Sequence, residues 1–442
     1  MRRKKNRVLA LGVMCTTVAM LTAGCLQSEN DGAADDGETK DGDGKVQILG
    51  AFPDPEAGYF EESLAEFEKD SGIDVTYVSS TDFTTEIRTR VQGGNPPDIA
   101  LFPQPGLVTS LGESGDAIPL NDLIALDDVE ETVIPGFLES VTGEDGNVYA
   151  APMRMAVKSI VWYPKPQFEE AGYQIPETWS ALQDLAEQMK SDGNTPWCLG
   201  AEAGADTGWV LTDWVEDMVL RTAGPDVYDK WYKHEIPFDD PAIAEAASMF
   251  GEDVLFDEGA VIGGPQGVLT TPFDVSPNDM FTDPPNCYMH RQGNFVTAFF
   301  PEDVQKNLSE SVGTFVLPPV EDGYDGTPIL GGGDMAAAFN NDSDVVEVME
   351  FITSAEFGAP WAGAGGWLSP HTTFDNSAYA DDITRQIAEL VQDADVFRFD
   401  ASDLMPPEVG AGTFWDNMVA WTAKEKSLEE ALRSIEESWP ES

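Results

Sequence analysis

The chain has 442 residues, of which 24 are Lys or Arg and 80 are Asp or Glu, so its formal net charge at pH 7 is −56. This surplus of negative charge excludes nucleic-acid binding and docking on anionic lipid, because both need cationic patches. We interpret the acidic composition as an adaptation to a saline habitat, where counterions screen the repulsion between carboxylates.

The first predicted element is an export signal over residues 1–24. Residues 2–5 are all Arg or Lys, and the apolar segment 8–23 is shorter than the roughly 20 residues of a membrane-spanning helix. Small residues and Cys25 close the segment, a pattern that resembles a bacterial lipoprotein signal. The resemblance implies cleavage before Cys25 and lipidation of its sulfur. An ordinary secretory signal with an incidental cysteine is the alternative.

Residues 25–44 form a predicted acidic, flexible tether between the lipid and the folded chain. They are rich in Asp, Glu and Gly and have almost no apolar side chain to bury. Burial therefore cannot offset the entropy cost of ordering this stretch. The roughly 400 residues that follow are enough for two lobes with separate cores.

Three apolar segments, 46–50, 73–77 and 99–102, are predicted strands, and apolar residues at helical spacing between them predict two helices. This strand–helix alternation indicates an α/β fold with a parallel sheet. Ligands bind beyond the carboxyl ends of such strands. The candidate loops are therefore 52–59, 79–83 and 103–106.

The rest of the chain continues the mixture of helices and strands. Apolar spacing predicts helices at 179–190, 209–221, 241–250, 347–354, 382–392 and 427–438, and strands at 312–317 and 329–339.

The positions of the cysteines and histidines indicate which disulfide and metal sites the chain can form. Cys15 lies in the signal and Cys25 carries the expected lipid, which leaves Cys198 and Cys287 as one pair. In an oxidising compartment a disulfide between these two is the default expectation. The three histidines have no metal-ligand spacing, so we expect no metal, and no motif indicates a cofactor.

Several short motifs resemble those of the bacterial extracellular solute-binding proteins (family 1) that serve carbohydrate ABC importers. They lie at residues 94–100, 143–152, 161–163, 176–179 and 331–335. Residues 196–198, 212–214 and 398–403 further resemble the α-glucoside-binding branch. The resemblance covers nearly all of 45–442 and depends on the order and spacing of the motifs.

The resemblance implies a two-lobed, periplasmic-binding-protein-like clamp in which each lobe is a sheet flanked by helices. The expected lobes are discontinuous: 45–154 with 335–375, and 155–334 with 376–442, joined by hinge crossings near Pro152, Gly332 and Phe374. The implied function is that of a monomeric, non-enzymatic, extracytoplasmic receptor, lipid-anchored to the cell membrane. It would capture a small-molecule sugar, an α-glucoside or malto-oligosaccharide, and deliver it to ABC permease subunits.

Sugar capture needs flat aromatic faces for the ring and polar side chains for its rim of hydroxyl groups. Residues of these types in loops or at strand ends are the candidates. From the first lobe they are Asp54, Glu56, Asp82, Gln104 and Arg154, with Trp367 as an aromatic platform. From the second lobe they are Trp209, Arg398 and Asp400, and Asp334 lies near a crossing and can belong to either lobe.

Each of these assignments has a structural alternative. With 80 acidic residues, any one carboxylate can be a solvated surface group, and Arg154 and Arg398 can each form a structural ion pair. Two functional alternatives also stay open. One is a secreted glycoside hydrolase, which would use two opposed carboxylates. The other is a receptor of the same fold for a non-sugar ligand.

Overall fold

A computed structural model describes residues 41–394 and 396–440. The expected signal, the expected lipidation site Cys25 and most of the tether lie outside the described residues. Within the described part of the chain, no helix is both long enough and apolar enough to cross a membrane.

The larger sheet is mixed and has the strand order β2-β1-β3-β8-β4, with β9 beside β8. β1 (Lys45–Gly50) pairs in parallel with β2 (Asp74–Ser79) and β3 (Ile99–Phe102), which confirms the expected parallel unit. The long β8 (Pro328–Ala338) runs antiparallel to β3 and to β4 (Ala151–Val157), and parallel to β9 (Val396–Phe399). β8 therefore connects the parallel unit to the second half of the chain.

The smaller sheet is antiparallel and has the order β6-β5-β7. Its strands are β6 (His290–Arg291), β5 (Ile160–Pro164) and β7 (Val312–Val316). Because β5 follows β4 after a short turn, a single stretch of chain leads from one sheet into the other.

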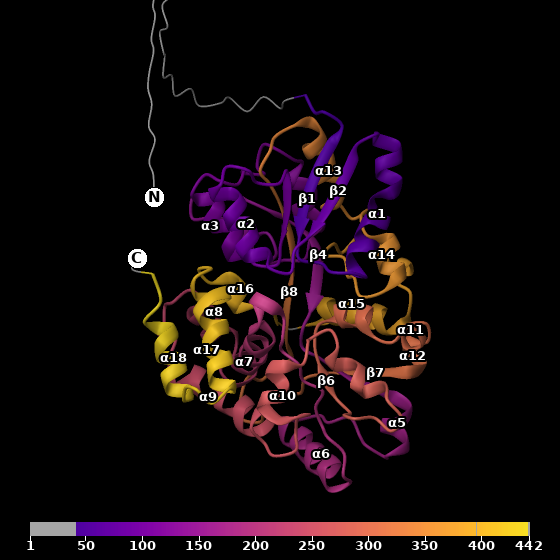
Figure 1. The fold of residues 1–442 in the computed structure, drawn as a ribbon, viewed down its shortest axis with the longest axis vertical. Coiled ribbons are helices and arrows are strands. Elements are labelled where there is room, and N and C mark those ends of the chain that lie inside the picture. Colours follow the sequence, from indigo (N-terminus) through magenta and orange to yellow (C-terminus); the bar gives the residue numbers. More distant parts are fainter. Residues whose placement is uncertain (1–40, 395, 441–442) are drawn as a thin grey trace, which may run out of the picture. The chain divides into compact units, whose positions relative to one another are not determined.

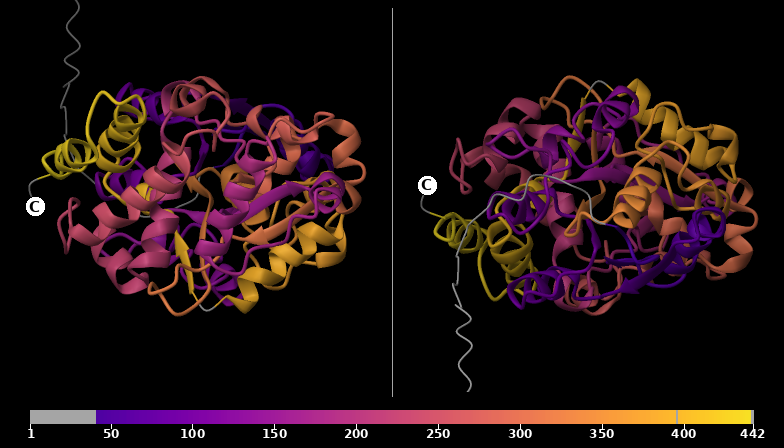
Figure 2. Two further views of the ribbon diagram at one scale, coloured as in Figure 1. Left: turned by 90° about the horizontal axis from the view of Figure 1, so that it is seen from below. Right: turned by 90° about the horizontal axis from the view of Figure 1, so that it is seen from above.

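Helices cover both sheets, and the views in Figures 1 and 2 show their placement. Around the larger sheet lie α1 (Glu56–Ser71), α2 (Phe83–Gln92), α3 (Pro105–Glu113), α4 (Leu126–Thr132), α13 (Ser343–Ile352) and α14 (Ala359–Ala364). The other helices are α5 (Lys165–Glu170), α6 (Trp179–Ser191), α7 (Trp209–Thr222), α8 (Pro225–Tyr232), α9 (Pro241–Phe250), α10 (Gly264–Thr270), α11 (Glu302–Gln305), α12 (Leu308–Ser311), α15 (Asp382–Asp393), α16 (Ala401–Leu404), α17 (Trp415–Thr422) and α18 (Leu428–Glu436).

Local signals explain several helix ends. Gly72 takes the left-handed conformation (φ 81°) that ends α1. Thr178 accepts a hydrogen bond from the Ala181 N–H and caps α6 as expected. Ser427 and Glu430 form a capping box, so α18 begins one residue later than the sequence suggests. The helix expected at 347–354 is instead α13, which begins four residues earlier.

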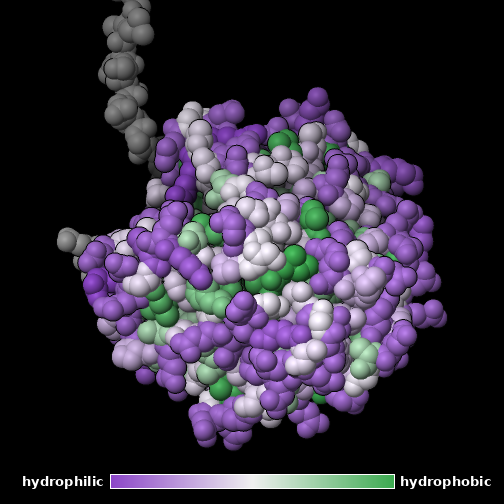
Figure 3. Space-filling model, turned by 60° about the horizontal axis from the view of Figure 1, so that its bottom comes forward, coloured by the Kyte–Doolittle hydropathy of each residue, from purple (hydrophilic) through white to green (hydrophobic). Residues whose placement is uncertain are grey.

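Two hydrophobic clusters form the core. One lies around the larger sheet, and the other surrounds α7, α9 and β5. The buried side chains of α15, among them Ile383 and Ile387, belong to the first cluster. Few large apolar side chains reach solvent, and Figure 3 shows a mainly hydrophilic face with interrupted hydrophobic areas.

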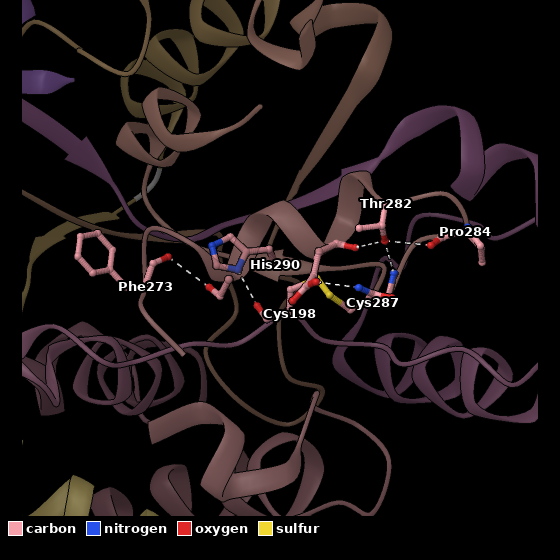
Figure 4. The surroundings of a disulfide bond; sticks show 9 residues. Cys198, Phe273, Thr282, Pro284, Cys287 and His290 are labelled. Atoms are coloured by element: carbon pink, nitrogen blue, oxygen red, sulfur yellow. Dashed lines mark hydrogen bonds between the residues drawn. A yellow bond between two sulfur atoms is a disulfide. The ribbon is translucent and has the colours of Figure 1, made fainter. Parts of the chain in front are cut away.

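Cys198 and Cys287 form the expected disulfide, with a Cα–Cα distance of 5.4 Å (Figure 4). Both residues are buried, and the Cys198 carbonyl accepts a hydrogen bond from His290 Nδ1 at 2.6 Å. The bridge thus joins the segment after α6 to the segment leading into β6.

The disulfide is expected to stabilise the fold. It spans 89 residues, and loop-closure entropy for such a span corresponds to about 4–5 kcal/mol at most. Reduction should therefore lower the melting temperature of the wild-type chain. A Cys198→Ser/Cys287→Ser variant should melt lower from the start and show no further change with reductant. Equal melting temperatures for the oxidised chain and this variant would contradict the expectation.

Candidate functional site

A cavity of about 600 Å³ lies at the carboxyl ends of β1, β2 and β3. Its wall includes residues from all three candidate loops, namely Phe52, Thr81 and Gln104. The opposite wall comes from the second half of the chain, including α7 and the segment after β9. The volume lies within the range of about 300–1,000 Å³ that is typical of small-molecule sites.

One side of the cavity is aromatic. Trp209, the first residue of α7, packs its ring against Phe273 and Phe295, with ring centroids 5.2 and 6.2 Å apart. Trp415 adds further aromatic area to this side, and Phe52 lies in the opposite wall. Flat apolar faces of this kind suit the hydrophobic face of a ring-shaped ligand.

The first polar centre of the cavity is Arg154. It pairs with Asp334 across β4 and β8, and its Nε donates to Asp334 Oδ2 at 2.6 Å. Its Nη1 donates to Glu56 Oε1 at 2.5 Å, from the first turn of α1. The guanidinium carbon also lies 4.4 Å from the centre of the Phe52 ring. Burial raises the pKa of both carboxyl groups, and the charge of Arg154 opposes that shift.

The second polar centre is Lys158, which follows β4. Its Nζ donates to Asp213 Oδ1 at 2.9 Å and to Asp400 Oδ2, and lies 5.5 Å from the Trp209 ring centre. Burial opposes ionisation of Asp400, but the Lys158 charge, together with hydrogen bonds from neighbouring groups, holds the pKa of Asp400 well below its usual range. This centre links β4 to α7 and to the segment after β9.

Carboxylates behind Lys158 lie close together without needing a metal ion. Oxygens of Asp213, Glu216 and Asp400 lie within 4.8 Å of one another. The Lys158 ammonium bonds to two of the three carboxylates and so supplies the positive charge. Glu216 also accepts the backbone N–H groups of Ala401 and Ser402, each at 3.1 Å.

A buried ion-pair network anchors α7 behind the cavity. Asp217 bonds to Arg221 and to Arg291, the latter at 2.9 Å, and accepts the Ser159 hydroxyl at 2.9 Å. Residues 210–221 of α7 are all buried. The helix is therefore held on every side, which fixes the position of Trp209 at its start.

The structure places six of the ten expected ligand-binding residues in the cavity wall: Glu56, Gln104, Arg154, Trp209, Asp334 and Asp400. Asp54 and Asp82 are exposed side chains beside the wall and do not line it. Both lie in the expected loops, and Asp82 lies close to the wall residues Gly204 and Asp206.

The structure places two of the expected ligand-binding residues, Trp367 and Arg398, outside the cavity wall. Trp367 is only 1% exposed and packs against Phe357 and Phe374, with ring centroids 6.1 and 5.2 Å apart, so it is a core residue and no ligand platform. Arg398 donates through Nε and Nη2 to the two oxygens of Asp229, at 2.7 and 2.9 Å, away from the cavity wall. Arg398 therefore forms a structural ion pair, which was the alternative to ligand binding considered for it.

Sequence reasoning missed Lys158, Asp403, Asp206 and Trp415, which all line the cavity. The sequence does indicate a special role for Lys158. It lies, like Arg154, within the mostly apolar stretch 151–164 of a chain that is poor in cations. Lysine is rarely buried unless it is paired. Asp213 and Glu216 give the same signal, because they are buried acidic residues among the apolar side chains of α7.

The chain is similar to known solute-binding proteins over most of its length. The family model described as bacterial extracellular solute-binding protein matches residues 53–359. An osmoprotective compounds-binding protein of Synechocystis sp. is 42% identical over 396 residues, which cover 90% of this chain and 92% of the relative. An alpha-glucosides-binding periplasmic protein of Rhizobium meliloti is 35% identical, covering 89% of this chain and 86% of that protein.

The fold agrees with solved receptor structures. A bacterial solute receptor with a preference for β-D-galactopyranose superimposes with a TM-score of 0.75 at 19% identity, covering 90% of this chain and 97% of the other. The expected α/β periplasmic-binding-protein fold is therefore confirmed. The matching family is non-catalytic, which rules out the glycoside hydrolase alternative.

Asp206 gives the cavity mouth a pH-sensitive group. Burial raises its pKa from an ordinary 3.8 to about 6, and the nearby charge of Asp82 adds to the shift. A hydrogen bond from Thr84 Oγ1 at 2.9 Å opposes it. The folded chain thus holds this proton more tightly than the unfolded chain does, so protonation stabilises the fold at acid pH.

We expect the stability that Asp206 contributes to be lost as the pH rises through about 6. Between pH 7 and pH 4.5, the free energy of unfolding of the wild type should rise relative to that of Asp206→Asn. Denaturant titrations at several pH values measure the difference. Asp82→Asn should reduce the effect, and the exposed Asp416→Asn should leave it unchanged. Parallel wild-type and Asp206→Asn profiles would disprove the assignment.

Proposed function

The chain belongs to the bacterial extracellular solute-binding protein family, and we propose that it captures an α-glucoside or short malto-oligosaccharide. The family implies a sugar-like ligand and ABC permease partners. The observation that carries the proposal is the combination, in one cavity, of an aromatic wall and two buried ion-pair centres.

The charge of the cavity argues against an anionic ligand. Arg154 and Lys158 are each bonded to two carboxylates, and Asp206 and Asp403 add further acidic groups to the wall. A ligand carboxylate or phosphate would meet this surplus at close range. Sugar hydroxyl groups, in contrast, can donate to the lone pairs that the ion pairs leave free.

The named relatives support the choice of ligand class. One is named for binding osmoprotective compounds and the other for binding alpha-glucosides. Both are at least 35% identical to this chain over most of its length. An osmoprotective glycoside would also suit a protein whose acidic surface we interpret as an adaptation to salt.

We further propose that the ligand is enclosed by closure of two lobes, 45–154 with 335–375 and 155–334 with 376–442. Both expected lobes contribute to the cavity wall. At the mouth, Thr84 from the first lobe donates to Asp206 from the second. On one flank, α3 packs against α16. Contacts of this kind would hold a closed clamp.

Binding is tested by calorimetry and thermal shift against maltose, maltotriose, trehalose and sucrose. At least one should raise the melting temperature, because binding to the folded state alone stabilises it, by about 2.7 kcal/mol at a hundredfold excess over Kd. Trp209→Ala should weaken that binding about tenfold or more through lost stacking, and Trp209→Phe should recover part of it. The exposed Ile175→Ala is the matched control.

Absence of binding to every neutral glycoside, with a polyamine or another non-sugar compound binding instead, would overturn the proposal. Wild-type affinity in Trp209→Ala would mean that the sugar does not use the aromatic wall.

The proposed attachment to the membrane depends on Cys25, which lies outside the described residues. We propose that the mature chain begins at a lipidated Cys25 and that residues 25–44 tether the receptor outside the cytoplasm as a monomer. The support is the sequence alone: the cationic start, the short apolar segment and the acidic stretch after it.

Cys25→Ala should abolish lipidation and shift the protein from the detergent fraction to the aqueous fraction in a phase-partitioning assay. Cys15→Ala is the matched control, because it also removes a cysteine near the N-terminus but leaves the lipidation site. Equal partitioning of Cys25→Ala and wild type would refute the anchor.

A further inference from the structure

Two polar side chains in the cavity wall have no bonding partner among the residues that the structure describes. Gln104 is 8% exposed and Asp403 is 7% exposed, and both line the cavity. Within residues 41–394 and 396–440, neither side chain makes a hydrogen bond or ion pair, and Gln104 Oε1 is fully enclosed without a partner. In contrast, Glu56 and Asp334 each accept a hydrogen bond from Arg154.

Unpaired buried polar groups are costly, and folded proteins keep few of them. Gln104 Oε1 is such a group, and Asp403, in the wall of the same cavity, is a largely buried carboxyl with no partner in the described part of the chain, which indicates that their partners come from a ligand. Removal of either side chain should therefore cost the free protein little stability, whereas removal of a bonded group such as Arg154 leaves unpaired charges behind.

Gln104 and Asp403 come from distant parts of the chain. Gln104 directly precedes α3, at the carboxyl end of β3, and Asp403 lies in α16. The two helices approach closely at Gly106, where a Cβ atom would lie 2.4 Å from the Met405 carbonyl oxygen. This approach places both side chains at the same flank of the cavity.

The chemistry of the two groups defines what they bind. The Gln104 amide can donate and accept, and the Asp403 carboxyl accepts in either protonation state. Burial and the adjacent charge of Asp400 raise the pKa of Asp403. Two neighbouring hydroxyl groups match this pair, because one can donate to the carboxyl while the other exchanges hydrogen bonds with the amide. A ligand carboxylate facing Asp403 would place acceptor oxygens against acceptor oxygens.

We propose that Gln104 and Asp403 form a specificity-determining subsite for two adjacent hydroxyl groups of an uncharged glycoside. The inference rests on the proposed function, because it assigns part of the same cavity. The subsite assigns Asp403 to ligand binding. It also predicts that the ligand has two adjacent hydroxyl groups at the flank between α3 and α16. A ligand with an acidic group at this position should bind weakly.

Calorimetry with maltose tests the subsite directly. Gln104→Ala and Asp403→Ala should each weaken maltose binding about tenfold or more, the effect of one lost hydrogen bond to a buried polar group. Asp403→Asn, which keeps an acceptor oxygen, should recover much of the loss. Both alanine variants should melt at or above the wild-type temperature. Gln92→Ala and Asp416→Ala, at exposed positions outside the cavity, are the matched controls.

Monodeoxy maltoses identify the hydroxyl groups. In the wild type, two analogues lacking neighbouring hydroxyl groups should bind weakly. Each should lose nothing further in the one variant, Gln104→Ala or Asp403→Ala, that removes the partner of its missing hydroxyl group. Maltobionate, with a carboxylate at one end, should bind more weakly than maltose in the wild type. Because the analogues are tested on the wild type, the result does not depend on the folding of a variant.

The outcomes separate the two proposals. If wild type binds maltose and both alanine variants bind it equally well, the subsite is wrong and the receptor function stands. If maltose, maltotriose, trehalose and sucrose all fail to bind, both proposals fall. If affinity and melting temperature fall together in Asp403→Ala but no deoxy analogue is discriminated, Asp403 is structural and the subsite is overturned.

Discussion

The structure depends on two buried cations that lie four residues apart. Arg154 in β4 and Lys158 just after it are each bonded to two carboxylates from distant parts of the chain. Glu56, Asp334, Asp213 and Asp400 would otherwise be buried anions in a chain with 80 acidic residues. Loss of one partner from a buried pair typically costs about 3–5 kcal/mol, because the other charge is left uncompensated.

These two centres also shape the cavity. Each cation fixes carboxylates on two elements, so that α1 and β8 meet at Arg154, and α7 and the segment after β9 meet at Lys158. Carboxylates held in this way keep free lone pairs at defined positions, which is what a ligand with several hydroxyl groups requires. The buried network around Asp217 then holds α7, and with it Trp209, against the same space.

Much of the fold could be predicted from the sequence because local signals agree with tertiary structure there. The alternation of β1, α1, β2, α2 and β3 follows hydrophobic periodicity, and the order of short motifs identified the family. The antiparallel entry of β8 could not be predicted, because strand pairing across more than 200 residues leaves no local pattern.

The site was predicted only in part, because side-chain direction, like the pairing of β8, depends on residues distant in the sequence. Its three loops follow from strand order, but the direction of a side chain depends on what packs around it. Trp367 follows two glycines and reads as exposed, yet it fills the core beside Gly358. Lys158 sits in an apolar run that reads as a buried strand, and only its pairing with Asp213 and Asp400 makes that position favourable.

A crystal structure of the chain with bound maltose would test the central claim most directly. The account predicts that the sugar occupies the cavity between the two polar centres, with one ring face against Trp209 and hydroxyl groups directed to Glu56, Asp334 and Asp400. Sugar bound elsewhere on the chain, with Arg154 and Lys158 still enclosed by their carboxylates and the cavity unoccupied, would contradict it.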